Sequence, residues 1–286
     1  MTADAPPPLI ALVEMTSGID PDANLRTMDA ALAAAADAGA VMAFFPEMSV
    51  LLDRDRARSA AHMRREADSD WLPALQAMAR RHGLWVHSGS MPFLSDDGER
   101  RVNRSHVIDA DGRTAARYDK IHMFDVSLPT GENWTESSAY AGGDALVVVD
   151  TPVGMLGLTI CYDLRFPELY RALVERGATS IAVPAAFTVP TGEAHWHVLL
   201  RARAIETGCH VLAAAQVGTH QDGRATYGHS IVVGPWGELH GESVAGDAHD
   251  APGCQLVVAP VDAAATAQAR RSIPLARSRA NRGVEP

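Results

Sequence analysis

Cys161 lies at the junction between a strand-like and a helix-like segment. Mostly apolar residues fill 155–160 and end at this thiol. Apolar residues then recur at helical spacing over 166–174, and Gly177 supplies a helix stop. A side chain at such an elbow points into the crevice at the carboxyl end of a sheet, where α/β proteins bind ligands. A thiolate there would be a strong nucleophile, and a buried structural thiol is the alternative interpretation.

Three other ionisable residues follow strand-like segments or lie in a long loop. Glu47 comes after the apolar segment 41–45, and Lys120 comes after the strand-like segment 115–118. Glu136 lies sixteen residues after Lys120. Taken singly, each is typical of a solvated surface charge. Their combination with Cys161 is what carries a family resemblance.

The segments FFPEMS, YDKIHMFD, TESS and LTICYDLRFPELYRA contain these four residues. Their order, spacing and neighbours together resemble the catalytic segments of the nitrilase superfamily of carbon–nitrogen hydrolases. The resemblance runs from about Leu9 to the arginine-rich tail. The later segments 184–206 and 213–237 resemble the amidase branch that acts on deaminated glutathione and, to a lesser degree, the omega-amidases.

The resemblance implies amide hydrolysis through a thioester. Cys161 would attack the carbonyl carbon, and Glu47 would take its proton, deliver one to the leaving nitrogen and later activate water. Lys120 would stabilise the oxyanion together with the backbone N–H of Tyr162. Glu136 would fix the orientation of Lys120 and the substrate. The expected substrate is deaminated glutathione, cleaved to 2-oxoglutarate and Cys-Gly. The alternatives are 2-oxoglutaramate, an N-carbamoyl amino acid, or a non-catalytic interaction protein on the same scaffold.

Substrate recognition is expected from residues near the elbow and in the next loop. Arg165 could clamp a substrate carboxylate with two hydrogen bonds, or it could pair with Glu168. Phe187 and Thr191 follow the strand-like segment 180–183 and match positions that line the pocket of related amidases. Packing and helix capping are their alternative roles.

Histidines are placed unfavourably for a metal site. His195 and His197 are two residues apart on an expected helix, so they do not face the same side. The segment 227–229 (Tyr-Gly-His) precedes a strand and is interpreted as structural. No metal and no cofactor are therefore expected.

Composition narrows the class of protein. The chain has 286 residues, a net charge of −10 and 47% hydrophobic residues, and acidic and basic residues alternate along most of it. Nucleic-acid binding needs a basic surface, which only the C-terminal arginines offer, and we expect neither nucleic-acid nor membrane partners.

The N-terminal segment does not resemble a secretion signal. The three cysteines do not form a disulfide or zinc pattern, so a cytoplasmic location is expected, with Cys209 and Cys254 as structural thiols.

Strand-like and helix-like segments alternate, and hairpins occur among the crossovers, which favours mixed sheets covered by helices. We expect a single domain over 1–286, with a core at about 8–265 and an arginine-rich tail at 266–286. Helices are expected after Asp20, after a Ser69 cap, after Cys161 and over 196–206. The expected strands are 9–14, 41–45, 84–90, 102–108, 115–118, 145–149, 155–160, 180–183, 211–216, 230–233 and 254–261.

The superfamily resemblance implies a four-layer α-β-β-α sandwich whose protomers pair through the elbow helices into dimers or tetramers. Three departures from the family pattern stand out. Glu14 replaces a usual glutamine in the first strand, and Asp119, beside Lys120, could compete with Glu136 for the ammonium group. Residues 126–142 diverge most, and this loop usually borders the pocket.

Overall fold

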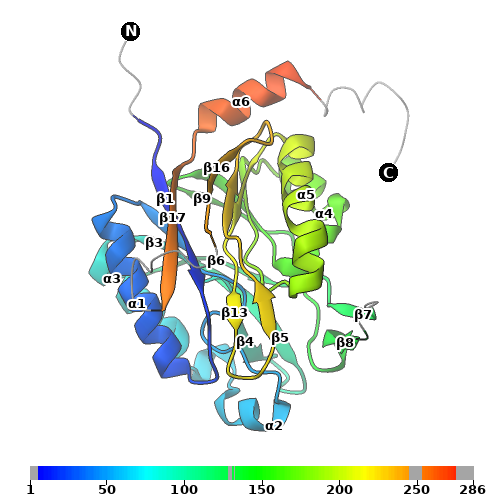
Figure 1. Ribbon diagram of the computed structural model, residues 1–286. Helices are drawn as coiled ribbons and strands as arrows, with labels where there is room; N and C mark the ends of the chain where they lie inside the picture. Colours follow the sequence, from blue (N-terminus) through cyan, green and yellow to red (C-terminus); the bar gives the residue numbers. More distant parts are fainter. Residues whose placement is uncertain (1–5, 128–130, 132, 245–252, 275–286) are drawn as a thin grey trace.

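The computed structural model describes residues 6–127, 131, 133–244 and 253–274. Figure 1 shows two β-sheets lying between helices α1 and α3 on one side and α4 and α5 on the other. This arrangement is the four-layer α-β-β-α sandwich that the family resemblance implied. The tail arginines Arg277, Arg279 and Arg282 lie outside the described residues.

The first sheet has seven strands in the order β17-β1-β2-β3-β5-β4, and β6 pairs with β5. Strands β1, β2 and β3 run parallel, and the other pairs are antiparallel. The strands are β1 (Leu9–Met15), β2 (Met42–Phe44), β3 (Trp85–His87), β4 (Met91–Leu94), β5 (Arg101–Ile108), β6 (Thr114–Asp119) and β17 (Cys254–Pro260).

The second sheet has six strands in the order β16-β15-β12-β11-β10-β9, with β10, β11 and β12 parallel. Its strands are β9 (Val148–Thr151), β10 (Gly154–Leu158), β11 (Ser180–Ala182), β12 (His210–Ala213), β15 (Ile231–Val233) and β16 (Leu239–Glu242). Two small hairpins complete the strands: β7 (Asp125–Ser127) with β8 (Asn133–Thr135), and β13 (Val217–Thr219) with β14 (Ala225–Tyr227).

The helices cover the outer faces of the sheets. Asp20 caps α1 through its side chain, and the proline that follows opens the helix, as the sequence predicted. The helices are α1 (Pro21–Asp37), α2 (Arg56–Ser59), α3 (Trp71–His82), α4 (Pro167–Glu175), α5 (Val189–Thr207) and α6 (Ala263–Ser272). Four 3₁₀ helices are η1 (Ala60–His62), η2 (Glu66–Asp68), η3 (Glu136–Ser138) and η4 (Cys161–Arg165).

Strand β1 shows why four layers form. Its residues are almost entirely buried, and alternate side chains point to opposite faces of the sheet. Ile10 and Leu12 pack with the second sheet, and Ala11 and Val13 pack with the residues of α1 and α3. A strand buried on both faces therefore separates two hydrophobic layers.

Two local expectations need correction. Ser69 does not cap α3: Asp70 occupies the N-cap position, and the Ser69 hydroxyl accepts a hydrogen bond from the Trp71 N–H. Helix α5 begins at Val189, not at 196, because Pro190 in its first turn is compatible with a helix start. Thr191 therefore belongs to the first turn of α5 and not to a loop.

A buried ion-pair network supports the first sheet next to Lys120. Arg104 pairs with Asp119 at 2.6 Å and with Glu66 at 2.8 Å. His106 lies 3.0 Å from the same Glu66 oxygen. Burial alone would raise the pKa of Glu66, but the hydrogen bonds and charges of His106 and Arg104 lower it to about 2.

We expect Glu66→Gln to destabilise the fold in a pH-dependent way. The folded-state pKa of Glu66 is depressed, so its stabilisation is present above pH ~4.5 and is lost as the pH falls towards 2. The substitution should lower the free energy of unfolding by about 1–3 kcal/mol at pH 7 and by less at pH 3. Urea unfolding at both pH values measures this, with the exposed Glu99→Gln as control. Equal losses at the two pH values would show that ionisation of Glu66 is not involved.

Within the described ranges, no helix is both long enough and apolar enough to cross a lipid bilayer.

Candidate active site

A cavity of about 390 Å³ brings together all four residues that the sequence singled out. Glu47 comes shortly after β2, and Lys120 follows β6 directly. Cys161 begins η4 just beyond β10, and Glu136 begins η3 after β8. The first sheet thus delivers Glu47 and Lys120 from strand ends, the second sheet delivers Cys161, and a loop supplies Glu136.

The backbone at Cys161 forms a tight elbow. Its φ of 48° lies in the left-handed region, which is unusual for a residue with a side chain and is common at functional sites. The Cys161 N–H donates to the Pro184 carbonyl oxygen at 2.9 Å. These constraints hold the thiol at the cavity wall with 7% of the residue exposed.

Asp163 fixes the elbow to the segment that follows Lys120. Its buried carboxylate accepts hydrogen bonds from the Ile160 N–H at 2.9 Å and from the Tyr118 hydroxyl at 2.7 Å. Its other oxygen accepts from the His122 N–H at 3.0 Å and lies 2.7 Å from His122 Nδ1. Asp163 was not predicted as a site residue, although a carboxylate two residues after a candidate nucleophile is a usable signal.

Lys120 lies between two carboxylates. Its Nζ is 3.0 Å from Glu47 Oε1 and 2.8 Å from Glu136 Oε2. Glu136 also accepts from the Phe124 N–H at 2.6 Å, which positions it in the loop. The concern that Asp119 competes for the ammonium group is not supported, because Asp119 pairs with Arg104.

Glu47 is held by donors on both oxygens. Asn103 Nδ2 donates to Oε1 at 2.9 Å, and the Ala186 N–H donates to Oε2 at 3.1 Å. Asn103 was not predicted as a site residue. A carboxamide in the middle of the buried strand β5 is the signal that could have found it.

The electrostatics favour a neutral thiol in the resting site. Burial raises the pKa of Cys161 well above its usual value, and the neighbouring Glu47 carboxylate raises it further, against the opposing charge of Lys120. Burial would lower the pKa of Lys120, but the charges of Glu136 and Glu47 raise it well above its usual value. The site therefore holds a neutral thiol, a carboxylate that can accept its proton and a permanently charged ammonium group.

This arrangement matches the parts that acyl transfer needs: a nucleophile, a carboxylate base beside it and a cation for a developing oxyanion. A model of the carbon–nitrogen hydrolase family matches residues 9–271. The chain belongs to the carbon–nitrogen hydrolase family. The match covers nearly all of the described residues, including all four cavity residues named above.

Relatives of this hydrolase agree with that assignment. It is 44% identical over 236 residues to the deaminated glutathione amidase of Yersinia enterocolitica, which covers 82% of each chain. Its fold matches the NitFhit protein of C. elegans with a TM-score of 0.84 and 34% identity, over 96% of this chain but only 65% of that one. It also matches an amidase from Nesterenkonia sp. AN1 (TM-score 0.75, 29% identity, 95% and 99% covered), in which acrylamide had added to the active site cysteine.

The residues expected to bind substrate surround a smaller hollow beside Cys161, lined by Tyr162, Arg165, Phe187 and Thr191 among others. The Arg165 guanidinium lies 5.4 Å from the centre of the Phe187 ring and 5.8 Å from that of Tyr162. It does not pair with Glu168: over the described chain, its polar side-chain contact is His195 Nδ1 at 3.4 Å. Arg165 thus keeps hydrogen-bonding capacity for a ligand.

Glu14, the departure in the first strand, makes buried hydrogen bonds of its own. Its Oε2 accepts from the Ser230 N–H at 2.8 Å and from the Ser243 hydroxyl at 2.6 Å. Glu14 thereby connects β1 with the second sheet, away from the reacting groups.

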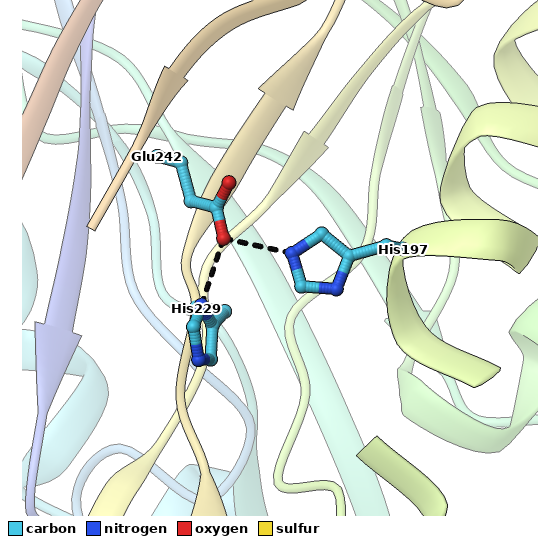
Figure 2. Close-up of side chains that lie close together, drawn as sticks. All are labelled: His197, His229 and Glu242. Atoms are coloured by element: carbon cyan, nitrogen blue, oxygen red, sulfur yellow. Dashed lines mark hydrogen bonds and ion pairs between the residues drawn. The ribbon is translucent and has the colours of Figure 1, made fainter. Parts of the chain in front are cut away.

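A second cluster of polar side chains lies outside the cavity. Figure 2 shows His197 from α5 and His229 pointing at one carboxylate oxygen of Glu242, and both nitrogen–oxygen distances are 2.7 Å. His195 is not part of it, in line with the i, i+2 argument, but the fold brings His229 and Glu242 to His197. Two imidazoles and a carboxylate are the ligand types that zinc uses, so this is the place among the described residues where a divalent ion could bind. In the structure, one nitrogen of each imidazole is hydrogen-bonded to Glu242 Oε1.

Proposed function

We propose that this hydrolase is a thiol-dependent amidase that cleaves deaminated glutathione to 2-oxoglutarate and Cys-Gly. The observation that carries the proposal is the buried arrangement of Cys161, Glu47 and Lys120, with Glu136 on the far side of Lys120. The proposed substrate is taken from relatives at 36–44% identity that are named deaminated glutathione amidases.

The reaction proceeds in two steps. The Cys161 sulfur attacks the amide carbonyl carbon while its proton passes to Glu47, and the Lys120 ammonium stabilises the oxyanion with the Tyr162 N–H. The C–N bond then breaks, the leaving nitrogen takes the proton from Glu47, and a 2-oxoglutaryl thioester remains. Water, activated by Glu47, hydrolyses this thioester and restores the thiol.

Substrate binding in this proposal uses the smaller hollow. Arg165 pairs with the 2-oxo acid carboxylate, and Phe187 and Thr191 line the acyl chain. The alternatives that use the same chemistry are 2-oxoglutaramate and an N-carbamoyl amino acid. Both lack the dipeptide leaving group, so the larger cavity would be partly unused.

We expect purified protein to release 2-oxoglutarate from deaminated glutathione. A coupled assay with glutamate dehydrogenase, NADH and added ammonium measures the product, and the same assay with 2-oxoglutaramate gives the ratio of kcat/KM values. For an N-carbamoyl amino acid, the coupling enzyme is supplied with 2-oxoglutarate and measures the ammonia released. A higher kcat/KM for deaminated glutathione supports the proposed substrate. A higher value for 2-oxoglutaramate, or for an N-carbamoyl amino acid, would assign the enzyme to another branch, and inactivity towards all three would favour the non-catalytic interaction protein.

The proposal includes a homodimer or homotetramer in the cytoplasm. Exposed apolar side chains on and beside α5 support self-association: Val198 is 68% exposed, Trp236 60% and Ile205 49%. The thiols of Cys161 and Cys209, which form no disulfide, support a reducing compartment.

A further inference from the structure

The cavity of about 390 Å³ next to Cys161, the larger of the two hollows described above, is lined in part by arginine side chains, although the chain as a whole is acidic. Four arginines line this cavity, and three of these are Arg54 and Arg56, between β2 and α3, and Arg101, at the start of β5. The chain carries a net charge of −10, so a local excess of positive charge requires a reason.

These three guanidinium groups lack carboxylate partners. In the described part of the chain, no Asp or Glu oxygen lies within 4.0 Å of the guanidinium nitrogens of Arg54, Arg56 or Arg101, although the backbone N–H of Arg54 donates to Asp222 Oδ2 at 2.8 Å. Arg56 donates to the Ser138 hydroxyl. Arg101 donates to the Ser59 hydroxyl and to the Arg56 carbonyl oxygen, both at 3.1 Å.

Neighbouring arginines behave differently. Arg58, two residues after Arg56, pairs with Asp53 at 2.7 Å and does not line the cavity. Arg224, which does line it, is paired with Asp222 at 2.8 Å. Of the four arginines that line the cavity, Arg224 is thus the one whose guanidinium group has a carboxylate partner among the described residues.

We propose that Arg54, Arg56 and Arg101 form a subsite for the carboxylate of the substrate's leaving group. This inference rests on the proposed function. Deaminated glutathione has one carboxylate at its 2-oxo acid end and another at the glycine of its leaving group. Cys161 lines both the cavity that contains the three arginines and the smaller hollow that contains Arg165. The amide bond can thus reach the thiol while each carboxylate lies near a guanidinium group.

The subsite predicts substrate selectivity. A carboxylate held by arginine forms charge-assisted hydrogen bonds, which are roughly twice as strong as neutral ones. 2-Oxoglutaramate, whose leaving group is ammonia, cannot use these arginines. The three arginines would therefore favour amides of an acidic amine or peptide over primary amides.

The double variant Arg54→Gln/Arg56→Gln tests this with three substrates: deaminated glutathione, its C-terminal carboxamide and 2-oxoglutaramate. For deaminated glutathione, kcat/KM should fall about 10–100-fold relative to 2-oxoglutaramate, mainly through KM. Wild-type enzyme should prefer the free carboxylate over the carboxamide by a similar factor, and the double variant should lose that preference. The double variant Arg81→Gln/Arg113→Gln, which removes two exposed positive charges that do not line the cavity, should leave both ratios unchanged.

Unchanged ratios in the double variant would overturn the subsite, and so would an equal fall for all three substrates. If wild-type enzyme is inactive towards deaminated glutathione, the proposed function itself fails. If wild-type enzyme is active but indifferent to the C-terminal carboxylate, only the subsite fails.

Discussion

Replacing Cys161 by alanine should lower kcat for deaminated glutathione by at least about 10⁴-fold, because the bond-forming atom is lost. Alanine fits the same backbone, since its side chain adds no strain at a φ of 48° that cysteine does not already have. The variant should therefore keep the circular dichroism spectrum of the wild type and unfold within a few degrees of it. Release of 2-oxoglutarate at matched protein concentration measures the loss.

Cys209→Ala is the matched control. Cys209 is also fully buried, and burial also raises its pKa, but it does not line the cavity. Its sulfur contacts the Ala178 carbonyl oxygen and Arg270, so its role is in packing. Activity should be retained in this variant. A Cys161→Ala enzyme with near wild-type turnover would contradict the thiol mechanism.

Glu47→Gln should lower kcat by about 10²–10⁴-fold, the range expected for loss of a general base. The resting thiol is neutral because burial and the Glu47 carboxylate raise its pKa, so attack requires that its proton be taken up. A glutamine side chain cannot accept that proton. It also cannot satisfy the Asn103, Lys120 and Ala186 donors as a carboxylate does, so some loss of stability should accompany the loss of activity.

Comparison of Glu136→Gln with Glu47→Gln distinguishes the loss of a general base from the loss of a negative charge beside Lys120. Both substitutions remove one negative charge beside the ammonium group, but of the two glutamates only Glu47 contributes to the raised pKa of Cys161. Steady-state kinetics should show a clearly smaller kcat loss for Glu136→Gln than for Glu47→Gln. Equal losses would show that the two glutamates act only by holding Lys120.

The sequence predicted the elements where local signals were strong. Asp20 and Pro21 marked the start of α1 because capping and ring geometry act within a few residues. The start of α5 was placed seven residues late, since the segment 189–195 lacks a clear apolar period. Ser69 and Asp70 are both good capping residues, and only tertiary packing decides between them.

The four cavity residues Glu47, Lys120, Glu136 and Cys161 were predicted because their motifs resemble a family, and not because spacing alone brings them together. Asn103 and Asp163 were missed since their importance lies in contacts between distant segments, such as the hydrogen bond from Tyr118 to Asp163. The His197, His229 and Glu242 cluster was missed for the same reason: its residues come from α5, the segment before β15, and β16.

The most direct measurement is peptide mapping of the enzyme after rapid acid quenching during turnover of deaminated glutathione. The mechanism predicts a 2-oxoglutaryl group on the peptide that contains Cys161, with none on that peptide in Cys161→Ala. A 2-oxoglutaryl group on a different side chain of the wild-type enzyme would contradict Cys161 as the nucleophile.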